Sequence, residues 1–195
     1  MQNHQKKPVL ITVSGLSGSG KSTVAKALAA LLPNTVYLDS DETRKEIFGV
    51  PHTQKLPPEA YTPEATQKLI DETARRIRDH IAAGKNVVQS VMLVSGVARD
   101  RQEELAREAG AEFQGIWLTA GARILFERVA ARKGDASDAS LEFAKEQQLW
   151  DIGAVKWPMI DAGQPREDVV KQALDILKPL IAPPPAGPKA GAPAP

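Results

Sequence analysis

A glycine-rich segment near the start of the chain has the residue types and spacing of a phosphate-binding loop. It reads Gly15-Leu16-Ser17-Gly18-Ser19-Gly20-Lys21-Ser22, a complete GxxxxGK[ST] pattern between an apolar run and a helical pattern. The glycines let the backbone curl so that successive N–H groups face one anion, and the helix that starts near Lys21 adds its positive dipole end. The segment therefore predicts a cradle for the phosphates of a nucleotide.

Two side chains at the end of this motif predict the chemistry. Lys21 would reach the β- and γ-phosphates of ATP and act as a catalytic residue, and the Ser22 hydroxyl would ligate the Mg²⁺ ion that bridges them. ATP and Mg²⁺ are therefore the expected cofactors.

Carboxylates for this site are expected at the end of the second strand. Magnesium usually needs a second protein contact from a neighbouring strand end, but the segment Val87-Val88-Gln89-Ser90-Val91 contains no acid. The cluster Asp39-Ser40-Asp41 is the best remaining source. We prefer Asp39 for the metal, and Asp41 for the acceptor as the group that orients or deprotonates its hydroxyl; the sequence leaves open which of the two is the base. The alternative is that Ser40 or Asp41 only caps the helix over 42–48.

Three arginines are further candidates. Arg128 and Arg132 are four residues apart on a predicted helix, just before the polar run 133–140, so they could clamp the transferring phosphoryl group under a lid. The alternative is that both arginines only lie on a solvent-exposed face of the helix. Arg44 follows the acidic cluster and could hold the acceptor, or it could be an exposed arginine on a short helix.

Apolar periodicity predicts alternating strands and helices. The expected strands are 9–13, 35–38, 86–92, 113–118 and 159–161, and the expected helices are 21–32, 42–48, 62–84, 96–109, 122–132, one from 141 and 165–180. The proline-containing segment 49–61 is expected to be an irregular loop. Strands separated by helices predict an α/β fold with a parallel sheet that is covered on both faces.

Length and composition bound the remaining possibilities. The 195 residues fit one domain over 8–181, with a disordered segment over 1–7 and a disordered Pro/Ala-rich tail over 182–195. The net charge of +1 makes a nucleic-acid partner unlikely, and the absence of cysteine excludes thiolate chemistry. No signal peptide or run of 18 apolar residues is present, so we expect a cytoplasmic protein without a membrane anchor.

With these residues assigned, the chain resembles the small P-loop kinases and kinase-like AAA family ATPases. The resemblance spans about 9–180, and it rests on GLSGSGKST from Gly15, YLDSDETRKEIFG from Tyr37, ERVAARKGDASD from Glu127 and IDAGQP from Ile160. It implies a three-layer P-loop fold with a five-stranded parallel sheet in the order 2-3-1-4-5 and a short lid.

The same resemblance assigns individual residues. It implies that Gly18, Gly20, Lys21, Ser22 and Thr23 hold the ATP phosphates, that Arg128 and Arg132 belong to the lid, and that Gln164 and Pro165 lie beside the adenine. Ser90 departs from the aspartate that some relatives carry in strand three, which weakens the choice of a catalytic base.

The predicted function is a kinase that transfers the γ-phosphoryl group of ATP to a small hydroxylated molecule. That acceptor could be a sugar, a sugar acid, a nucleoside or an aminoglycoside-like compound. The alternative is a regulatory module that binds and slowly hydrolyses ATP. A GTPase is disfavoured because the chain has no Asn-Lys-x-Asp motif. The sequence leaves open whether the protein is a monomer or a dimer.

Overall fold

The computed structural model describes residues 7–132 and 136–181. Within them, five parallel strands form one sheet in the order β2-β3-β1-β4-β5. The strands are β1 (Val9–Gly15), β2 (Thr35–Asp39), β3 (Asn86–Ser90), β4 (Glu112–Thr119) and β5 (Met159–Asp161). The predicted α/β class and strand order 2-3-1-4-5 are therefore confirmed.

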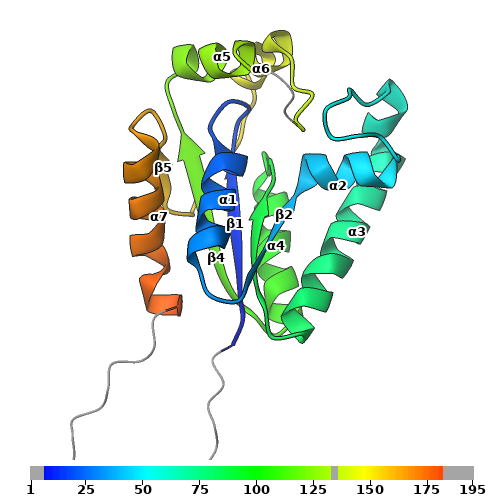
Figure 1. Cartoon of the computed structure of the whole chain (residues 1–195). Helices are drawn as coiled ribbons and strands as arrows, with labels where there is room; N and C mark the ends of the chain where they lie inside the picture. Colours follow the sequence, from blue (N-terminus) through cyan, green and yellow to red (C-terminus); the bar gives the residue numbers. More distant parts are fainter. Residues whose placement is uncertain (1–6, 133–135, 182–195) are drawn as a thin grey trace, which may run out of the picture.

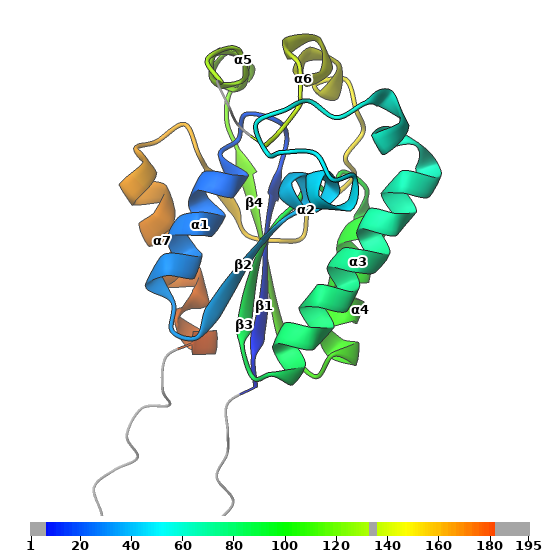
Figure 2. The same ribbon diagram turned by 45° about the vertical axis from the view of Figure 1, so that its right-hand side comes forward.

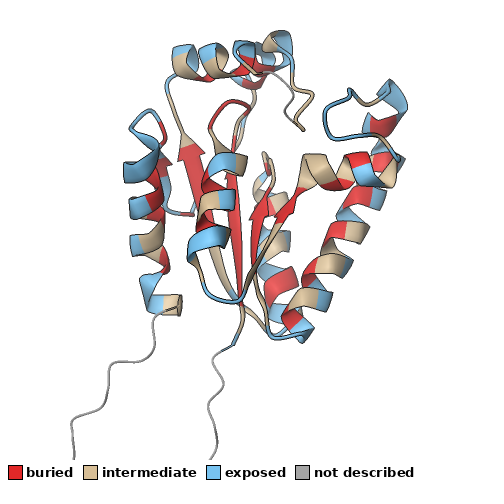
Figure 3. Ribbon diagram, viewed as in Figure 1, coloured by how far each residue is buried: buried red, intermediate tan, exposed pale blue. Residues whose placement is uncertain are grey.

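Helices cover both faces of this sheet, as Figures 1 and 2 show. One face carries α1 (Lys21–Leu31) and α7 (Arg166–Ile181), and the other carries α3 (Pro63–Ala82) and α4 (Gly96–Glu108). The central strand β1 is buried throughout, because its side chains alternate between the two layers. Val9, Ile11 and Val13 join the apolar cluster with α1 and α7, and Leu10 joins the cluster with α3 and α4 (Figure 3).

The remaining elements gather at the carboxyl ends of the strands (Figure 1). They are α2 (Ser40–Ile47), the short 3₁₀ helix η1 (Pro58–Tyr61), α5 (Ala122–Ala130) and α6 (Leu141–Gln147). Ligands in open α/β sheets bind at this edge, so these elements are the ones that build a site.

Several boundaries differ from the prediction. Helix α2 begins at Ser40 rather than 42, because the Asp39 side chain caps it by accepting from the N–H groups of Asp41 and Glu42. Strand β3 ends at Ser90 rather than 92; beyond it, the N–H of Leu93 donates to the side-chain hydroxyl of Ser14 on β1 and not to a backbone carbonyl. The segment 49–61 was expected to be irregular but contains η1.

The expected disordered termini, apart from Lys7, lie outside the described residues, and so does the first part of the expected lid, residues 133–135. In the part of the chain that the structure describes, no helix is long and apolar enough to cross a membrane.

Candidate active site

A cavity of about 1150 Å³ lies where these elements meet. One side of it is lined by the phosphate-binding loop and by residues of α5 and the start of α7, and the other side by α2, η1 and α3. Residues after β3, residues 137–140 and α6 complete the wall. Phosphate-loop residues and the candidate acceptor residues therefore share one cavity.

The phosphate-binding loop has the backbone that a phosphate cradle needs. Gly18 and Gly20 have φ values of 83° and 87°, in the left-handed region that favours glycine. A Cβ atom on Gly18 would lie 2.4 Å from the carbonyl oxygen of Leu125 on α5, whereas a Cβ on Gly20 would meet nothing within 4 Å. The missing side chain of Gly18 allows α5 to pack closely against the loop, and the missing side chain of Gly20 leaves space beside the loop.

Lys21 is the first residue of α1 and lines the cavity. Its Nζ donates to the backbone carbonyl of Leu16 at 3.1 Å, so the ammonium group lies over the loop that would hold the phosphates. Ser19, Ser22 and Thr23 also line the cavity, whereas Gly15 lies beneath it at the end of β1, where a Cβ would be 2.3 Å from the carbonyl oxygen of Leu118.

Three oxygen-bearing side chains meet beside the loop. Ser22 Oγ lies 2.9 Å from Asp39 Oδ2 and 3.1 Å from Ser90 Oγ. The last two residues are paired across β2 and β3, so the sheet register brings them together. From the sequence, Ser90 was noted only because it stands where some relatives carry an aspartate. Its position at the end of a strand was the signal that could have assigned it to the site.

These oxygens fit a magnesium ion. Mg²⁺ prefers hard oxygen ligands and usually takes one or two protein groups together with waters and substrate phosphates. In the described residues, no group of three or more His, Cys, Asp or Glu side chains is placed to hold a metal. Ser22 and Asp39 are the residues that would hold the ion.

The two acids of the cluster have different surroundings. Asp39 is buried, and its carboxylate accepts from the N–H groups of Asp41 and Glu42 and from the hydroxyls of Ser22 and Tyr37. Asp41 instead lines the cavity. Burial and the Asp39 carboxylate raise the pKa of Asp41 above its ordinary value, although Lys21, a hydrogen bond from Ser137 and Arg44 act in the opposite direction.

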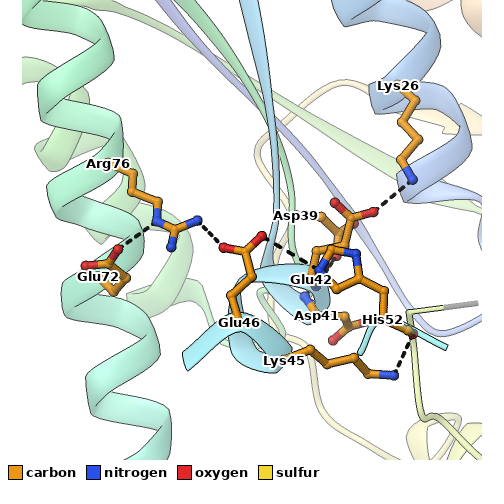
Figure 4. Close-up of polar contacts among 9 residues, drawn as sticks. All are labelled: Lys26, Asp39, Asp41, Glu42, Lys45, Glu46, His52, Glu72 and Arg76. Carbon is orange, nitrogen blue, oxygen red and sulfur yellow. Dashed lines mark hydrogen bonds and ion pairs between the residues drawn. The ribbon is translucent and has the colours of Figure 1, made fainter. Parts of the chain in front are cut away.

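Helix α2, which carries Asp41, is held between two other helices (Figure 4). Lys26 of α1 forms an ion pair with Glu42 at 2.9 Å, and Arg76 of α3 forms one with Glu46 at 2.6 Å. Exposed pairs of this kind contribute little stability each, but together with the Asp39 cap they orient the helix.

Arg44 lies on the cavity wall and has partners of its own. Its guanidinium donates to the carbonyl of Ala60 and the hydroxyl of Thr66, and it lies 5.1 Å from the ring centroid of Tyr61. Burial lowers the pKa of Arg44, and Tyr61 and Asp41 oppose this. Arg44 is therefore held by its neighbours and is not a freely exposed arginine.

The predicted lid arginines both line the cavity. Arg128 donates from Nη2 to the carbonyl of Ala162 at 2.7 Å, so α5 is connected to the segment after β5. Arg132 lies beyond the last residue of α5, Ala130, rather than on the helix as expected. Of the predicted adenine-side residues, Gln164 lines the cavity, whereas the carbonyl of Pro165 accepts from the N–H groups that start α7.

Sequence reasoning missed a buried ion pair on the acceptor side. Lys45, only 1% exposed, donates to Asp138 and to the carbonyls of His52 and Gln54, and Asp138 also accepts from the N–H of Leu56. Burial raises the pKa of Asp138, but the hydrogen bonds from Leu56, Tyr61 and Lys45 outweigh it and hold the pKa below its ordinary value. No local pattern pairs residues this far apart.

Gln147 is a second buried residue that the sequence did not indicate. Its Oε1 accepts from the N–H of Ser17 at 2.8 Å, and its Nε2 donates to the hydroxyl of the same serine at 3.0 Å. Ser17, predicted to contact phosphate, lines the cavity and is also held by α6 through these two bonds, so its contact with phosphate stays a prediction.

Residues 10–150 match the family described as AAA domain. The chain belongs to this family. The chain is 28% identical over 182 residues to an uncharacterised protein of Mycobacterium tuberculosis, a match that covers 88% of this chain and 35% of that protein. It is 24% identical over 180 residues to a uridine kinase of Streptococcus mutans, which covers 90% of this chain and 80% of that enzyme.

The chain is also similar to a solved gluconokinase structure from Sinorhizobium meliloti. The TM-score is 0.62 at 26% sequence identity, and the match covers 90% of this chain and 95% of that one. The predicted membership among kinase-like P-loop proteins is thus confirmed. The chain spans about a third of the length of the mycobacterial relative, for which the covered share is 35%.

Proposed function

We propose that this protein is a kinase that transfers the γ-phosphoryl group of ATP to a hydroxyl group of a small molecule. The observation that carries the proposal is the shared cavity, in which Lys21 of the phosphate-binding loop and Asp41 of α2 both lie on the wall. Relatives named as uridine kinase and adenylyl-sulfate kinase, and a gluconokinase structure, support a phosphotransferase.

Asp41 acts as the general base in this proposal. Its carboxylate accepts the proton of the acceptor hydroxyl while the oxygen attacks the γ-phosphorus and the bond to the β-bridging oxygen of ATP breaks, which releases ADP. The raised pKa of Asp41 supports this role, because a base works best when its pKa approaches the working pH. Asp39 is unsuited to it, since its buried carboxylate caps α2 and lies beside Ser22, whereas Asp41 lines the cavity.

Cationic groups stabilise the charge on the transferring phosphoryl group. Lys21 faces the β- and γ-phosphates, and Arg128 and Arg132 approach from the lid side of the cavity. Mg²⁺, held by Ser22 and Asp39, supplies further neutralisation of the phosphate oxygens when it is bound. The backbone N–H groups of 18–23 orient the phosphates for in-line attack.

A regulatory module that hydrolyses ATP slowly is the alternative function. The two are separated by measuring ADP release from Mg·ATP with purified protein, with and without sugars, sugar acids, nucleosides and aminoglycosides, and by identifying the phosphorylated product. Stimulation by one class, lost in Lys21→Ala, is the result we expect. Slow Lys21-dependent hydrolysis that no acceptor stimulates would instead establish the regulatory module.

A further inference from the structure

The part of the cavity wall that lies outside the phosphate-binding loop, α5 and α7 has a distinct chemical character. We call it the acceptor chamber and define it by the lining residues of α2, 55–61, α3, 91–98 and α6. Its apolar lining residues come from four separate parts of the chain: Leu56, Pro58, Leu69, Ile70, Val91, Met92, Leu93, Ala98 and Phe143. A surface of this kind excludes water from one face of a bound molecule.

Two aromatic side chains of the chamber remain accessible. Tyr61 is 49% exposed and Phe143 is 36% exposed, and both line the cavity. The Tyr61 ring is fixed by its hydroxyl bond to Asp138 and by the Arg44 guanidinium, and the Phe143 ring packs edge-on against Trp150 with centroids 5.5 Å apart. Rings held in this way are platforms on which a planar or apolar body can stack.

The buried cations on this side already have partners. Lys45 donates to two carbonyls and to Asp138, and Arg44 donates to Ala60 and Thr66. Lys55 also lines the chamber but is exposed to solvent. The described residues of the chamber therefore provide no buried pair of cations for a carboxylate, sulfate or phosphate. Such a group would meet Arg44 alone, whose charge is already partly balanced by the neighbouring Asp41 carboxylate.

The acids of the chamber are likewise unsuited to an acceptor that carries several positive charges. The Asp138 carboxylate is neutralised by Lys45 and also receives the Leu56 N–H and the Tyr61 hydroxyl. In the described part of the chamber, Asp41 is then the carboxylate left to meet the acceptor, and a single acid cannot balance several ammonium groups.

From these contacts we infer that the acceptor is an uncharged alcohol with an apolar or aromatic body, which stacks in the chamber and presents its hydroxyl to Asp41. The inference rests on the proposed kinase function and narrows its acceptor class. Sugar acids, phosphorylated alcohols and aminoglycosides are the classes that it excludes. Nucleoside-like molecules and aryl glycosides are the classes that fit.

Matched acceptors test the inference directly. Phenyl β-glucoside and phenyl β-glucuronide differ at C6, where a carboxylate replaces the primary alcohol, and glucose lacks the ring. Uridine and its monophosphate form a second pair that differs in charge, and the 5′- and 3′-monophosphates are both used because each blocks a different hydroxyl. Binding is measured by calorimetry in the presence of a non-hydrolysable ATP analogue, and transfer is measured by phosphorus NMR of the product. We expect at least about tenfold tighter binding of the uncharged aromatic member of each pair.

Two variants distinguish stacking from a general structural effect. Phe143→Ala should weaken binding of the uncharged aromatic members about tenfold and leave the affinity for the ATP analogue unchanged. Leu149→Ala is the matched control, because Leu149 is 86% exposed, follows the same helix and is not a lining residue of the cavity. Melting temperatures of both variants show whether the fold is kept.

Equal or tighter binding of the anionic members, or no measurable binding of either uncharged aromatic compound at millimolar concentration, would overturn the inference. Transfer to an anionic member that is lost in Lys21→Ala would overturn it while supporting the kinase. Binding of the uncharged aromatic compounds without transfer to them or to any other acceptor would support the chamber assignment and overturn the kinase.

Discussion

Lys45 Nζ lies 3.0 Å from Asp138 Oδ1, although the two residues are 93 positions apart in the chain. The contact joins α2 to the polar segment before α6, and the second oxygen of Asp138 binds the N–H of Leu56 and the hydroxyl of Tyr61. The pair therefore connects three segments around the acceptor side of the cavity. Because the Lys45 ammonium is buried, removing its counter-ion should lower the stability of the folded protein.

Asp138→Ala should destabilise the protein by about 3 kcal/mol, because it leaves a buried ammonium without its carboxylate. Urea unfolding followed by circular dichroism measures the change. Glu127→Ala is the control: Glu127 forms an exposed pair with Arg123, so it should change stability by no more than about 0.5 kcal/mol. Equal stability of Asp138→Ala and the wild type would contradict the described pair.

The same carboxylate predicts a pH dependence of stability. The folded-state pKa of Asp138 lies below its ordinary value of 3.8, so its contribution is fully present above pH 3.8 and is lost as the pH falls through the lower folded value. Unfolding free energies from pH 6 down to about pH 2, compared for the wild type and Asp138→Ala, should differ by a constant amount above pH 3.8, and the difference should shrink below it. A constant difference across that range would count against the lowered pKa.

Lys21→Ala should abolish phosphoryl transfer, because the variant loses the charge that faces the β- and γ-phosphates, worth at least about 3 kcal/mol of transition-state stabilisation. This corresponds to a loss of more than about a hundredfold in kcat/KM. Lys171→Ala is the matched control, since Lys171 is an exposed residue of α7 that pairs with Asp175 and does not line the cavity. Near-normal turnover of Lys21→Ala would end the proposed mechanism.

Asp41→Asn should lower kcat by about 10²- to 10⁴-fold and leave ATP affinity nearly unchanged, because the amide cannot accept the acceptor proton. In the wild type, kcat should fall on the acid side with an apparent pKa above the ordinary aspartate value of 3.8, since burial and Asp39 raise the pKa of Asp41. Initial rates over a pH series check both points. If Asp41→Asn retained the rate of the wild type and its acid limb, another residue would have to be the base.

Gln147→Ala should weaken nucleotide binding and lower stability by about 1–2 kcal/mol, because it leaves the buried N–H of Ser17 without its acceptor. Calorimetry with the ATP analogue and thermal unfolding measure the two effects. Gln148→Ala, an exposed neighbour on the same helix end, should change neither. Identical behaviour of the two variants would show that the contact between α6 and the loop is unimportant.

The local sequence pattern alone was enough to predict the α/β layout and the phosphate-binding loop. Strand β1 is apolar at every position from Val9 to Ile11 and again at Val13, and this run leads directly into the glycine motif and α1. Chain neighbours decide such features, because glycine spacing and helical or strand periodicity act over a few residues. The Thr62 cap of α3 was likewise predictable from one hydroxyl and the proline after it.

The assignment of the two acids needed the tertiary structure. From the sequence, Asp39 and Asp41 are equivalent carboxylates after one strand, and Ser40 or Asp41 was the expected alternative cap. In the fold Asp39 is the cap and also contacts Ser22, whereas Asp41 remains on the cavity wall. Burial and the set of hydrogen-bond donors, which depend on packing, separate the two roles.

The sequence by itself determined that the chain is a P-loop protein with a parallel sheet covered by helices, since those properties follow from short-range spacing. Only the tertiary structure decided how the acceptor side is built. Lys45 meets Asp138, and Gln147 meets Ser17, across 93 and 130 positions of the chain. Contacts over such distances depend on how helices close over the sheet edge, and no local periodicity records them.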